Sequence, residues 1–230
     1  MAYSPCYLCH AQAAKGEDFC TPCLGEMPWN SRACQQCALP LNDPCTMFCN
    51  TCFSTTPPYE KCFASLIYAP PISRLITRYK HQHNEPLGAV LARLMLNTLA
   101  DDFRDSLHDA VIMAVPMHQH ALRQRGFNQA QQLAQSVATH LALPLDTGLE
   151  ASRAHISQQT LKAEQRRKNL LGIFKYSHSA PKHTLIIDDV MTTGATVSAI
   201  SELLKQRGCE QISVLCLART PADGHSPNAG

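Results

Sequence analysis

Residues 184–196 constrain the fold more than any other segment of this chain. They begin with an apolar run, residues 185–187, which is typical of a strand buried on both faces of a parallel sheet. From residue 197 onward, apolar side chains recur at helical spacing. The segment therefore predicts a parallel strand, a turn and a helix in direct succession.

The turn carries polar groups that suit a sugar phosphate. Asp188 and Asp189 follow the strand at the edge where ligands of parallel sheets bind. Their carboxylates can accept hydrogen bonds from vicinal sugar hydroxyls, directly or through a metal ion. The residues that follow offer hydroxyls, backbone amides and a helix N-terminus to a phosphate; they are Thr192, Thr193, Gly194, Ala195 and Thr196. The alternative is an ordinary strand-to-helix turn with a solvated acidic pair.

This segment resembles the motif of type I phosphoribosyltransferases that binds phosphoribosyl pyrophosphate (PRPP). The resemblance rests on an apolar run, two acids, two apolar residues and Thr-Thr-Gly-x-Thr. It implies an α/β domain of the type I phosphoribosyltransferase class, with a Rossmann-like parallel sheet flanked by helices. It also implies that Asp188 and Asp189 are the catalytic carboxylates of an active enzyme and that Mg²⁺ accompanies PRPP.

A second strand, loop and helix are predicted over residues 111–142, with Asn128 as the helix N-cap. Arg123 and Arg125 lie in the loop. Because a guanidinium group can bind two phosphate oxygens in a bidentate manner, the loop is a candidate pyrophosphate site. Two solvated arginines are the alternative. The sequence Arg-x-Arg-Gly-Phe-Asn-Gln is similar to the signature of the ComF family.

Two further stretches resemble the same family. In residues 68–80 an apolar strand leads to a short helix that ends in the basic Lys80, which the resemblance assigns to pyrophosphate or DNA binding. Residues 159–174 resemble the family's long mobile loop and contain Arg166 and Arg167. A cationic loop of this kind could close over a polyphosphate and exclude water, whereas a solvated helix face is the alternative.

The first sixty residues have a different character, because eight cysteines there form four Cys-x-x-Cys pairs. Two such pairs supply the four thiolates that a structural zinc ion prefers, so we expect a double zinc ribbon with two Zn²⁺ ions. The predicted ligands are Cys6, Cys9, Cys20, Cys23, Cys34, Cys37, Cys49 and Cys52. Sequential and crossed pairing both stay open, and His10 and Cys45 are spare ligands.

Disulfides, redox chemistry and an iron–sulfur cluster are the competing explanations for these cysteines. No basic and apolar leader precedes them, so a reducing, cytoplasmic location is expected and zinc is favoured over disulfides. Redox activity needs one Cys-x-x-Cys pair at a helix start, and four pairs in a Pro-rich segment do not indicate it. The iron–sulfur cluster stays an alternative.

The chain is expected to divide into a zinc-ribbon domain (1–58), a phosphoribosyltransferase-like domain (59–220) and a disordered tail (221–230). We expect strands near 64–69, 111–115, 183–187 and 211–217, and helices near 86–100, 129–142 and 196–207. From Lys61 onward the chain has 18 basic and 13 acidic residues, which permits phosphorylated ligands or single-stranded DNA without requiring either. Aromatic residues make up only 6% of the chain, so an extended base-stacking platform is not expected. No apolar run is long enough for a membrane span.

The ComF resemblance implies a protein that binds PRPP or a 5′-phosphorylated nucleotide and helps to handle single-stranded DNA in natural transformation, with other DNA-uptake proteins as partners. Two alternatives stay open. One is an active phosphoribosyltransferase that joins a base to PRPP and releases pyrophosphate, and the other is a non-catalytic ligand sensor in sugar or nucleotide metabolism.

Overall fold

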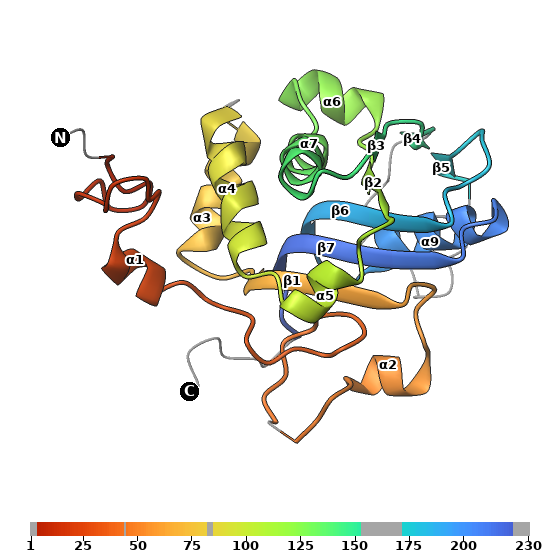
Figure 1. The fold of residues 1–230 in the computed structure, drawn as a ribbon, viewed down its shortest axis with the longest axis horizontal. Helices are drawn as coiled ribbons and strands as arrows, with labels where there is room; N and C mark the ends of the chain where they lie inside the picture. Colours follow the sequence, from red (N-terminus) through yellow and green to blue (C-terminus); the bar gives the residue numbers. More distant parts are fainter. Residues whose placement is uncertain (1–3, 44, 82–84, 153–171, 223–230) are drawn as a thin grey trace.

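The computed structural model describes residues 4–43, 45–81, 85–152 and 172–222. Its centre is a five-stranded parallel sheet with the order β1-β7-β6-β2-β3, and a short antiparallel pair, β4 and β5, lies beside it (Figure 1). The strands are β1 (Lys61–Ile67), β2 (Val111–Ala114), β3 (Leu145–Asp146), β4 (Glu150–Ala151), β5 (Phe174–Lys175), β6 (His183–Met191) and β7 (Gln211–Arg219). The described residues thus form the parallel α/β fold that the sequence predicts.

Helices lie on both sides of this sheet (Figure 1). They are α1 (Thr21–Gly25), α2 (Asn50–Ser54), α3 (Ile72–His81), α4 (Glu85–Asn97), α5 (Asp101–Asp105), α6 (Gln119–Arg125), α7 (Gln129–Leu141) and α9 (Ala195–Gln206). The longer predicted strands and helices all form, with bounds shifted by a few residues. Asn128 caps α7 as predicted, since its Oδ1 accepts a hydrogen bond from the Ala130 amide at 3.1 Å.

Two hydrophobic cores cover the two faces of the sheet. One contains Leu185 and Ile187 of β6 together with buried residues of α3, α4 and α7. The other contains Ile186 of β6 together with Val197, Ile200 and Leu204 of α9. Successive strand residues point to opposite faces, which is why neighbours in β6 belong to different cores. The continuous apolar run is therefore buried on both sides.

The N-terminal cysteines divide between the same two cores. Cys6 and Cys20 pack in the core that contains α4, whereas Cys34, Cys37 and Cys49 pack in the core that contains α9. A bidentate ion pair from Arg93 of α4 to Asp18, with N–O distances of 2.9 and 2.7 Å, ties the first module to the first face. The domain boundary after residue 58 remains a proposal, because both modules share their packing with the sheet.

Two parts of the fold differ from the sequence-based expectation. β6 continues through Asp188 and Asp189 to Met191, because β7 pairs with it as far as Arg219. The carboxylates therefore lie near the end of the strand and not beyond it. The segment with Arg123 and Arg125 is the helix α6 and not a loop, and it ends at Gly126, whose φ of 79° is left-handed.

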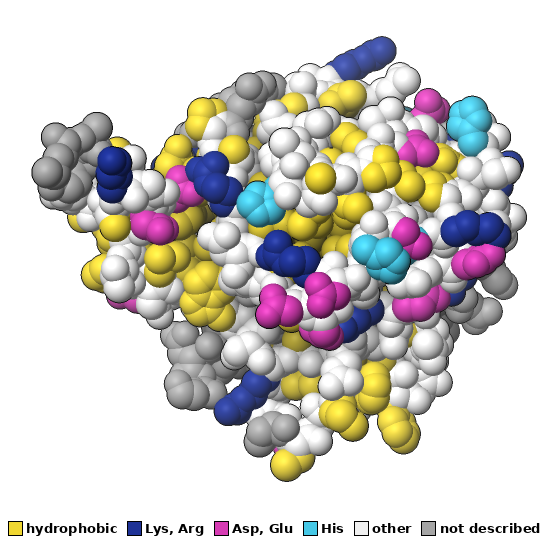
Figure 2. Space-filling model, viewed as in Figure 1, with side chains coloured by type: hydrophobic (Ala, Val, Ile, Leu, Met, Phe, Trp, Pro, Cys, Tyr) yellow, Lys and Arg dark blue, Asp and Glu magenta, His cyan; other side chains and the backbone are white. Residues whose placement is uncertain are grey.

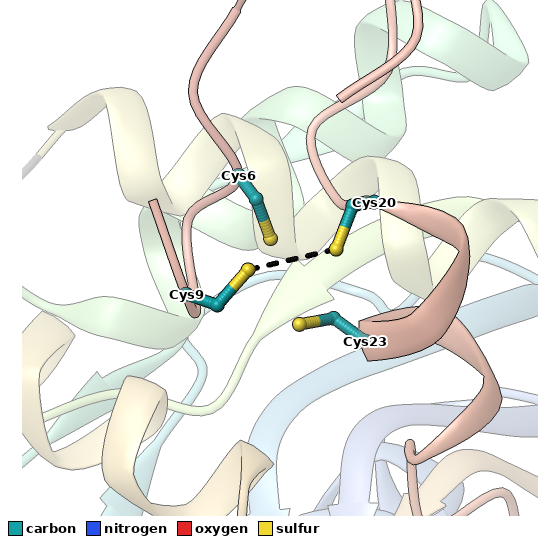
Figure 3. Close-up of side chains that lie close together, drawn as sticks. All are labelled: Cys6, Cys9, Cys20 and Cys23. Carbon is teal, nitrogen blue, oxygen red and sulfur yellow. Dashed lines mark hydrogen bonds between the residues drawn. The ribbon is translucent and has the colours of Figure 1, made fainter. Parts of the chain in front are cut away.

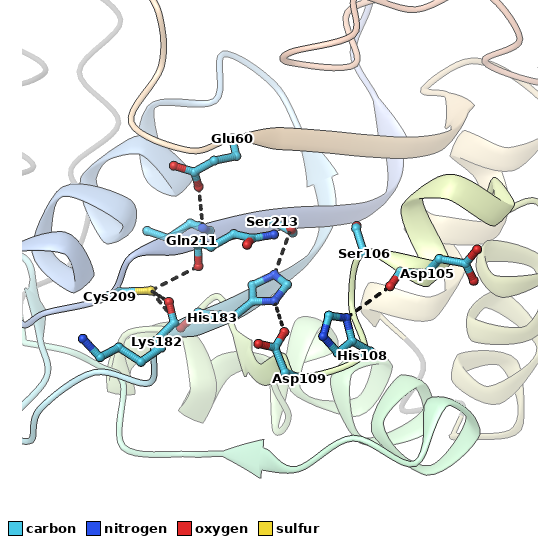
Figure 4. Close-up of polar contacts among 12 residues, drawn as sticks. Glu60, Asp105, Ser106, His108, Asp109, Lys182, His183, Cys209, Gln211 and Ser213 are labelled. Carbon is cyan, nitrogen blue, oxygen red and sulfur yellow. Dashed lines mark hydrogen bonds and ion pairs between the residues drawn. The ribbon is translucent and has the colours of Figure 1, made fainter.

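An Asp-His-Ser chain, in which His183 and Ser213 are buried and Asp109 is exposed, lies at the opposite, amino-terminal edge of the sheet (Figure 4). His183 Nδ1 lies 2.7 Å from Asp109 Oδ1, and its Nε2 lies 3.2 Å from Ser213 Oγ. Only 2% of Ser213 is exposed, so a substrate cannot reach its hydroxyl as a serine nucleophile requires. This chain therefore fixes the starts of β6 and β7 and is not a hydrolase site.

The surface in Figure 2 mixes positive and negative side chains, and hydrophobic side chains gather at its lower rim. Large exposed hydrophobic residues in the described part are Met47, Phe48, Phe53 and Leu122. This face has no continuous basic stripe, so a DNA-binding surface there would have to be composite. Within the described residues, no helix is both long and apolar enough to cross a membrane.

Candidate functional site

Side chains from two distant parts of the chain meet at the carboxyl end of β6. Asp189 follows the face of Leu185 and Ile187, which turns its carboxylate toward α3. There Lys80 Nζ lies 2.7 Å from Asp189 Oδ2, with side-chain exposures of 24% and 13%. Asp188 Oδ1 accepts the Asp189 amide at 2.8 Å, and Asp189 Oδ1 accepts the Val190 amide at 2.7 Å. The structure therefore places Lys80 beside the predicted ribose carboxylates.

The two carboxylates have different electrostatic environments. Desolvation, and next the negative charge of Asp189, raise the pKa of Asp188 to about 8. The ammonium group of Lys80 opposes this rise but does not cancel it. Asp188 therefore keeps its proton to a higher pH than an exposed aspartate, beside an Asp189 that is paired with a cation. A magnesium ion or a second ammonium group would favour ionisation of Asp188.

We expect Asp188→Asn to stabilise the ligand-free protein at pH 8. In the unfolded chain an aspartate loses its proton near pH 4, whereas folded Asp188 keeps it to about pH 8. The folded state thus binds more protons in this window, so wild-type stability falls as the pH rises from about 4 to 8. The variant should have a higher unfolding temperature at pH 8 and a smaller difference between pH 6 and pH 8. Thermal melts without Mg²⁺ measure this, with the exposed Asp105→Asn as control; equal pH responses in all three proteins would contradict it.

The turn after β6 presents its polar groups at the start of α9. Thr192 and Thr193 are exposed, and Gly194 is the N-cap with a φ of 78°, a conformation that disfavours residues with a Cβ. The Ala195 amide donates to Thr193 Oγ1 at 3.3 Å, and the Ser198 amide donates to the Gly194 carbonyl at 2.9 Å. The first amide of α9 thus lies beside the Thr193 hydroxyl at a helix N-terminus, which is an arrangement that suits a phosphate ligand.

Tyr79, the neighbour of Lys80 in α3, packs beside this site and connects α3 to α7. It is fully buried, and its hydroxyl donates to Gln132 Oε1 at 2.8 Å, with the Gln129 carbonyl at 3.2 Å. Burial and the nearby charge of Asp189 both raise the pKa of Tyr79. The Gln129 side chain is buried, and its amide oxygen and nitrogen have no partner among the described residues. Sequence reasoning did not identify these residues, because a tyrosine or glutamine on a helix has no signature of its own.

The predicted arginines are less closely placed. Arg123 and Arg125 are exposed on the last turn of α6, which follows the carboxyl end of β2. Among the described residues, no hydrogen bond or ion pair links either one to Asp188 or Asp189. Arg166 and Arg167, and the rest of the predicted mobile loop, lie outside the described residues, as does most of the predicted tail.

Eight cysteines form two clusters in sequential pairing. Within each cluster the four sulfur atoms all lie within 4.8 Å of one another; the clusters are Cys6, Cys9, Cys20, Cys23 and Cys34, Cys37, Cys49, Cys52. Figure 3 shows the first, whose four side chains converge on one point. His10 and Cys45 belong to neither cluster, and none of the twelve cysteines forms a disulfide.

The cluster geometry suits a tetrahedral zinc ion. The Sγ–Sγ distance is 3.6 Å between Cys9 and Cys20 and 3.7 Å between Cys37 and Cys49. Four thiolates at about 2.3 Å from a central zinc ion lie about 3.8 Å apart. Burial of Cys6 favours the thiol, yet backbone hydrogen bonds from Cys9, Cys20 and Leu8 lower the Cys6 pKa to about 6. Burial, and next the hydrogen bonds with neighbouring cysteines, raise the pKa of Cys23 in the same cluster. Both clusters can therefore hold a metal ion.

Arg219 is a further site residue that sequence reasoning did not select. It ends β7 directly beside Met191 of β6 and is only 5% exposed. Its guanidinium group donates to the carbonyls of Met191 and Thr192, where the chain leaves β6 and enters the turn before α9. A lone arginine that ends a buried apolar strand is the signal that could have indicated it.

Comparison with known proteins agrees with this architecture. Residues 122–230 match the phosphoribosyl transferase domain family. The chain is 33% identical over 221 residues to DNA utilization protein YhgH of Escherichia coli O157:H7, covering 94% of this chain and 96% of that protein. It is 34% identical over 179 residues to competence protein F of Haemophilus influenzae, covering 74% and 78%. A purine phosphoribosyltransferase structure from Pyrococcus horikoshii aligns with 60% of this chain and 78% of its own, with a TM-score of 0.38 and 20% identity.

The parallel sheet, the matched domain and the two cysteine clusters define a phosphoribosyltransferase-type domain that follows two four-cysteine modules. The similarity to YhgH over nearly the whole of both proteins places the chain more narrowly. It belongs to the ComF family.

Proposed function

We propose that the carboxyl end of β6 binds PRPP or a 5′-phosphorylated nucleotide together with Mg²⁺, and that the protein helps to handle single-stranded DNA during natural transformation. The ligand proposal rests on one observation. Asp188, Asp189 and Lys80 lie together at the carboxyl end of β6, and the hydroxyl-rich start of α9 follows the two carboxylates in the chain. Carboxylates suit ribose hydroxyls and Mg²⁺, and the turn suits a 5-phosphate.

Lys80 has two roles in this proposal. Without a ligand, its ammonium group neutralises Asp189 and lowers the cost of holding two carboxylates side by side. When Mg²⁺ or the ribose hydroxyls take over Asp189, Lys80 is released to bind phosphate oxygens. Because Asp188 has a pKa of about 8, binding through its ionised form should release a proton and strengthen as the pH rises toward 8.

The DNA part of the proposal draws on the family. Relatives carry the names competence protein F and DNA utilization protein, and the second name refers to the use of DNA. We propose a cytoplasmic location, because both metal clusters need reduced cysteines. Arg123 and Arg125, exposed on α6, are proposed to contact phosphates of DNA or of pyrophosphate, together with Arg166 and Arg167.

Two measurements on the zinc-loaded protein test the proposal. Calorimetric titration with PRPP and Mg²⁺ should show saturable binding, and ribose without a phosphate should show none. An assay for pyrophosphate release with a panel of bases then separates an active transferase, which turns over, from a sensor or DNA-handling protein, which only binds. Absence of affinity for PRPP and for every 5′-phosphorylated ribose would overturn the ligand proposal.

DNA binding is tested with fluorescently labelled single strands. Affinity should fall steeply between about 50 and 200 mM salt, because arginine–phosphate contacts release counterions. Arg123→Ala should weaken binding and reduce the salt dependence, whereas Arg74→Ala, an exposed arginine on α3, should change neither. Binding that is indifferent to salt and equal in the three proteins would contradict the DNA role.

A further inference from the structure

Arg219 joins the second cysteine cluster to the phosphate-binding turn. Its Nε donates to the carbonyl of Cys37 at 3.1 Å. Its Nη1 donates to the carbonyls of Met191 at 3.0 Å and Thr220 at 3.1 Å, and also to the carbonyl of Thr192. One buried side chain thus holds a metal knuckle and the residues that enter the turn.

Within the described residues, the hydrogen-bond partners of this guanidinium group are all backbone carbonyls. In the described part of the structure, no carboxylate forms an ion pair with Arg219. A buried cation is costly unless it is fully hydrogen-bonded or matched by negative charge. Four thiolates around Zn²⁺ carry a formal charge of −2, so a loaded second centre would supply that charge beside Cys37. The loaded centre therefore favours the position that Arg219 occupies.

A second contact runs in parallel with the first. In the Cys34–Cys37 knuckle, Gln36 Nε2 donates to the carbonyls of Tyr59 at 2.5 Å and Glu60 at 2.9 Å. Tyr59 is buried in the same core as that cluster, and its hydroxyl would lie 3.6 Å from a Cβ placed on Gly194. The knuckle thus supports both the start of the turn, through Arg219, and its glycine, through Tyr59.

The first cysteine cluster provides an internal comparison. Its module packs on the other core and is tied to α4 through Asp18 and Arg93. In the described residues, no hydrogen bond connects it to residues 188–196. The two centres have the same ligands but different neighbours, so only the second is in a position to influence the turn.

We propose that the second four-cysteine centre, through Arg219, sets the conformation of the phosphate-binding turn, so that metal loading of this centre controls ligand affinity. Arg219 is a positioning residue in this scheme, and the affinity part of the inference rests on the proposed PRPP site. A displacement of the turn by about 1 Å is enough to cost a phosphate ligand much of its affinity, since its amides and hydroxyls must point at one place.

The test measures backbone hydrogen exchange of the peptide that covers residues 191–197, together with zinc content and PRPP binding. Arg219→Gln should keep two zinc ions, accelerate exchange in this peptide and weaken PRPP binding by about tenfold or more. Arg104→Gln is the matched control, because Arg104 also donates to a backbone carbonyl, that of Leu96, far from the turn. It should change none of the three readouts.

Cys52→Ser and Cys23→Ser test whether the metal centres affect the turn, because each variant removes the last cysteine of one cluster. Cys52→Ser should accelerate exchange in the turn, whereas Cys23→Ser should not. Equal exchange of the turn in wild type, Arg219→Gln and Cys52→Ser would overturn the coupling, whether or not PRPP binds. If exchange responds but wild type binds no 5′-phosphorylated ribose, the coupling stands and the proposed ligand is wrong.

Discussion

Cys34→Ser is expected to lower the zinc content from two ions to one per chain and to unfold the second cysteine module. Cys34 is 1% exposed, and its sulfur accepts a hydrogen bond from the Cys49 amide at 3.3 Å. A structural zinc ion contributes roughly 10–16 kcal/mol of binding free energy at neutral pH, and that free energy is coupled to folding. Among the described residues of the module, no hydrogen bond or ion pair is large enough to replace it.

Metal analysis and thermal unfolding measure this effect. Cys45→Ser is the matched control, because Cys45 is exposed and belongs to neither cluster within the described residues. It should keep both zinc ions and the wild-type unfolding temperature. Zinc loss in Cys45→Ser, with two ions retained in Cys34→Ser, would show that the ligand set differs from the one described.

Asp189→Asn is expected to weaken Mg²⁺-dependent PRPP binding by about 100-fold, which corresponds to about 2.7 kcal/mol. The amide keeps the shape of the side chain but removes the negative charge that would hold Mg²⁺ or orient the ribose hydroxyls. If the protein is an active transferase, pyrophosphate release should be lost in the same variant. The comparison is made by calorimetry at saturating Mg²⁺.

Lys80 complicates this variant, because Asp189→Asn leaves an unpaired ammonium group that attracts phosphates. Lys80→Gln and the double variant complete a thermodynamic cycle that separates the two effects. We expect the single variants to be non-additive in the ligand-free protein, since both break the same 2.7 Å ion pair. PRPP affinity that is unchanged in Asp189→Asn and in the double variant would exclude this carboxylate from the site.

Much of the fold could be predicted because its signals are local. The apolar run of β6, the helical spacing in α7 and α9 and the cap at Asn128 each involve residues close in sequence, and each indicated the element that forms. Helix α6 was not predicted, because its N-cap is His118, which is not a usual capping residue. The two-residue strands β3, β4 and β5 are too short for a periodic pattern.

The candidate site also divides into a part that local sequence signals predicted and a part that depends on contacts between distant segments. The adjacent carboxylates and the threonine turn were found from the sequence because they share one continuous segment. The partner of Asp189 could not be assigned in the same way, since Lys80 reaches it from α3. Arg219 was missed because its role depends on Cys37, which lies 182 residues away in the chain.

The sequence by itself determined the parallel α/β domain, the eight clustered cysteines and the hydroxyl-rich turn between β6 and α9, because each depends on spacing within a short stretch of chain. Only the tertiary structure decided that the knuckles pair sequentially, that the two cysteine modules pack on opposite faces of the sheet and that Arg219 connects one of them to the turn. These features arise where distant segments meet. Burial there removes water from charged groups, so each must find its partner in whatever segment the fold brings beside it.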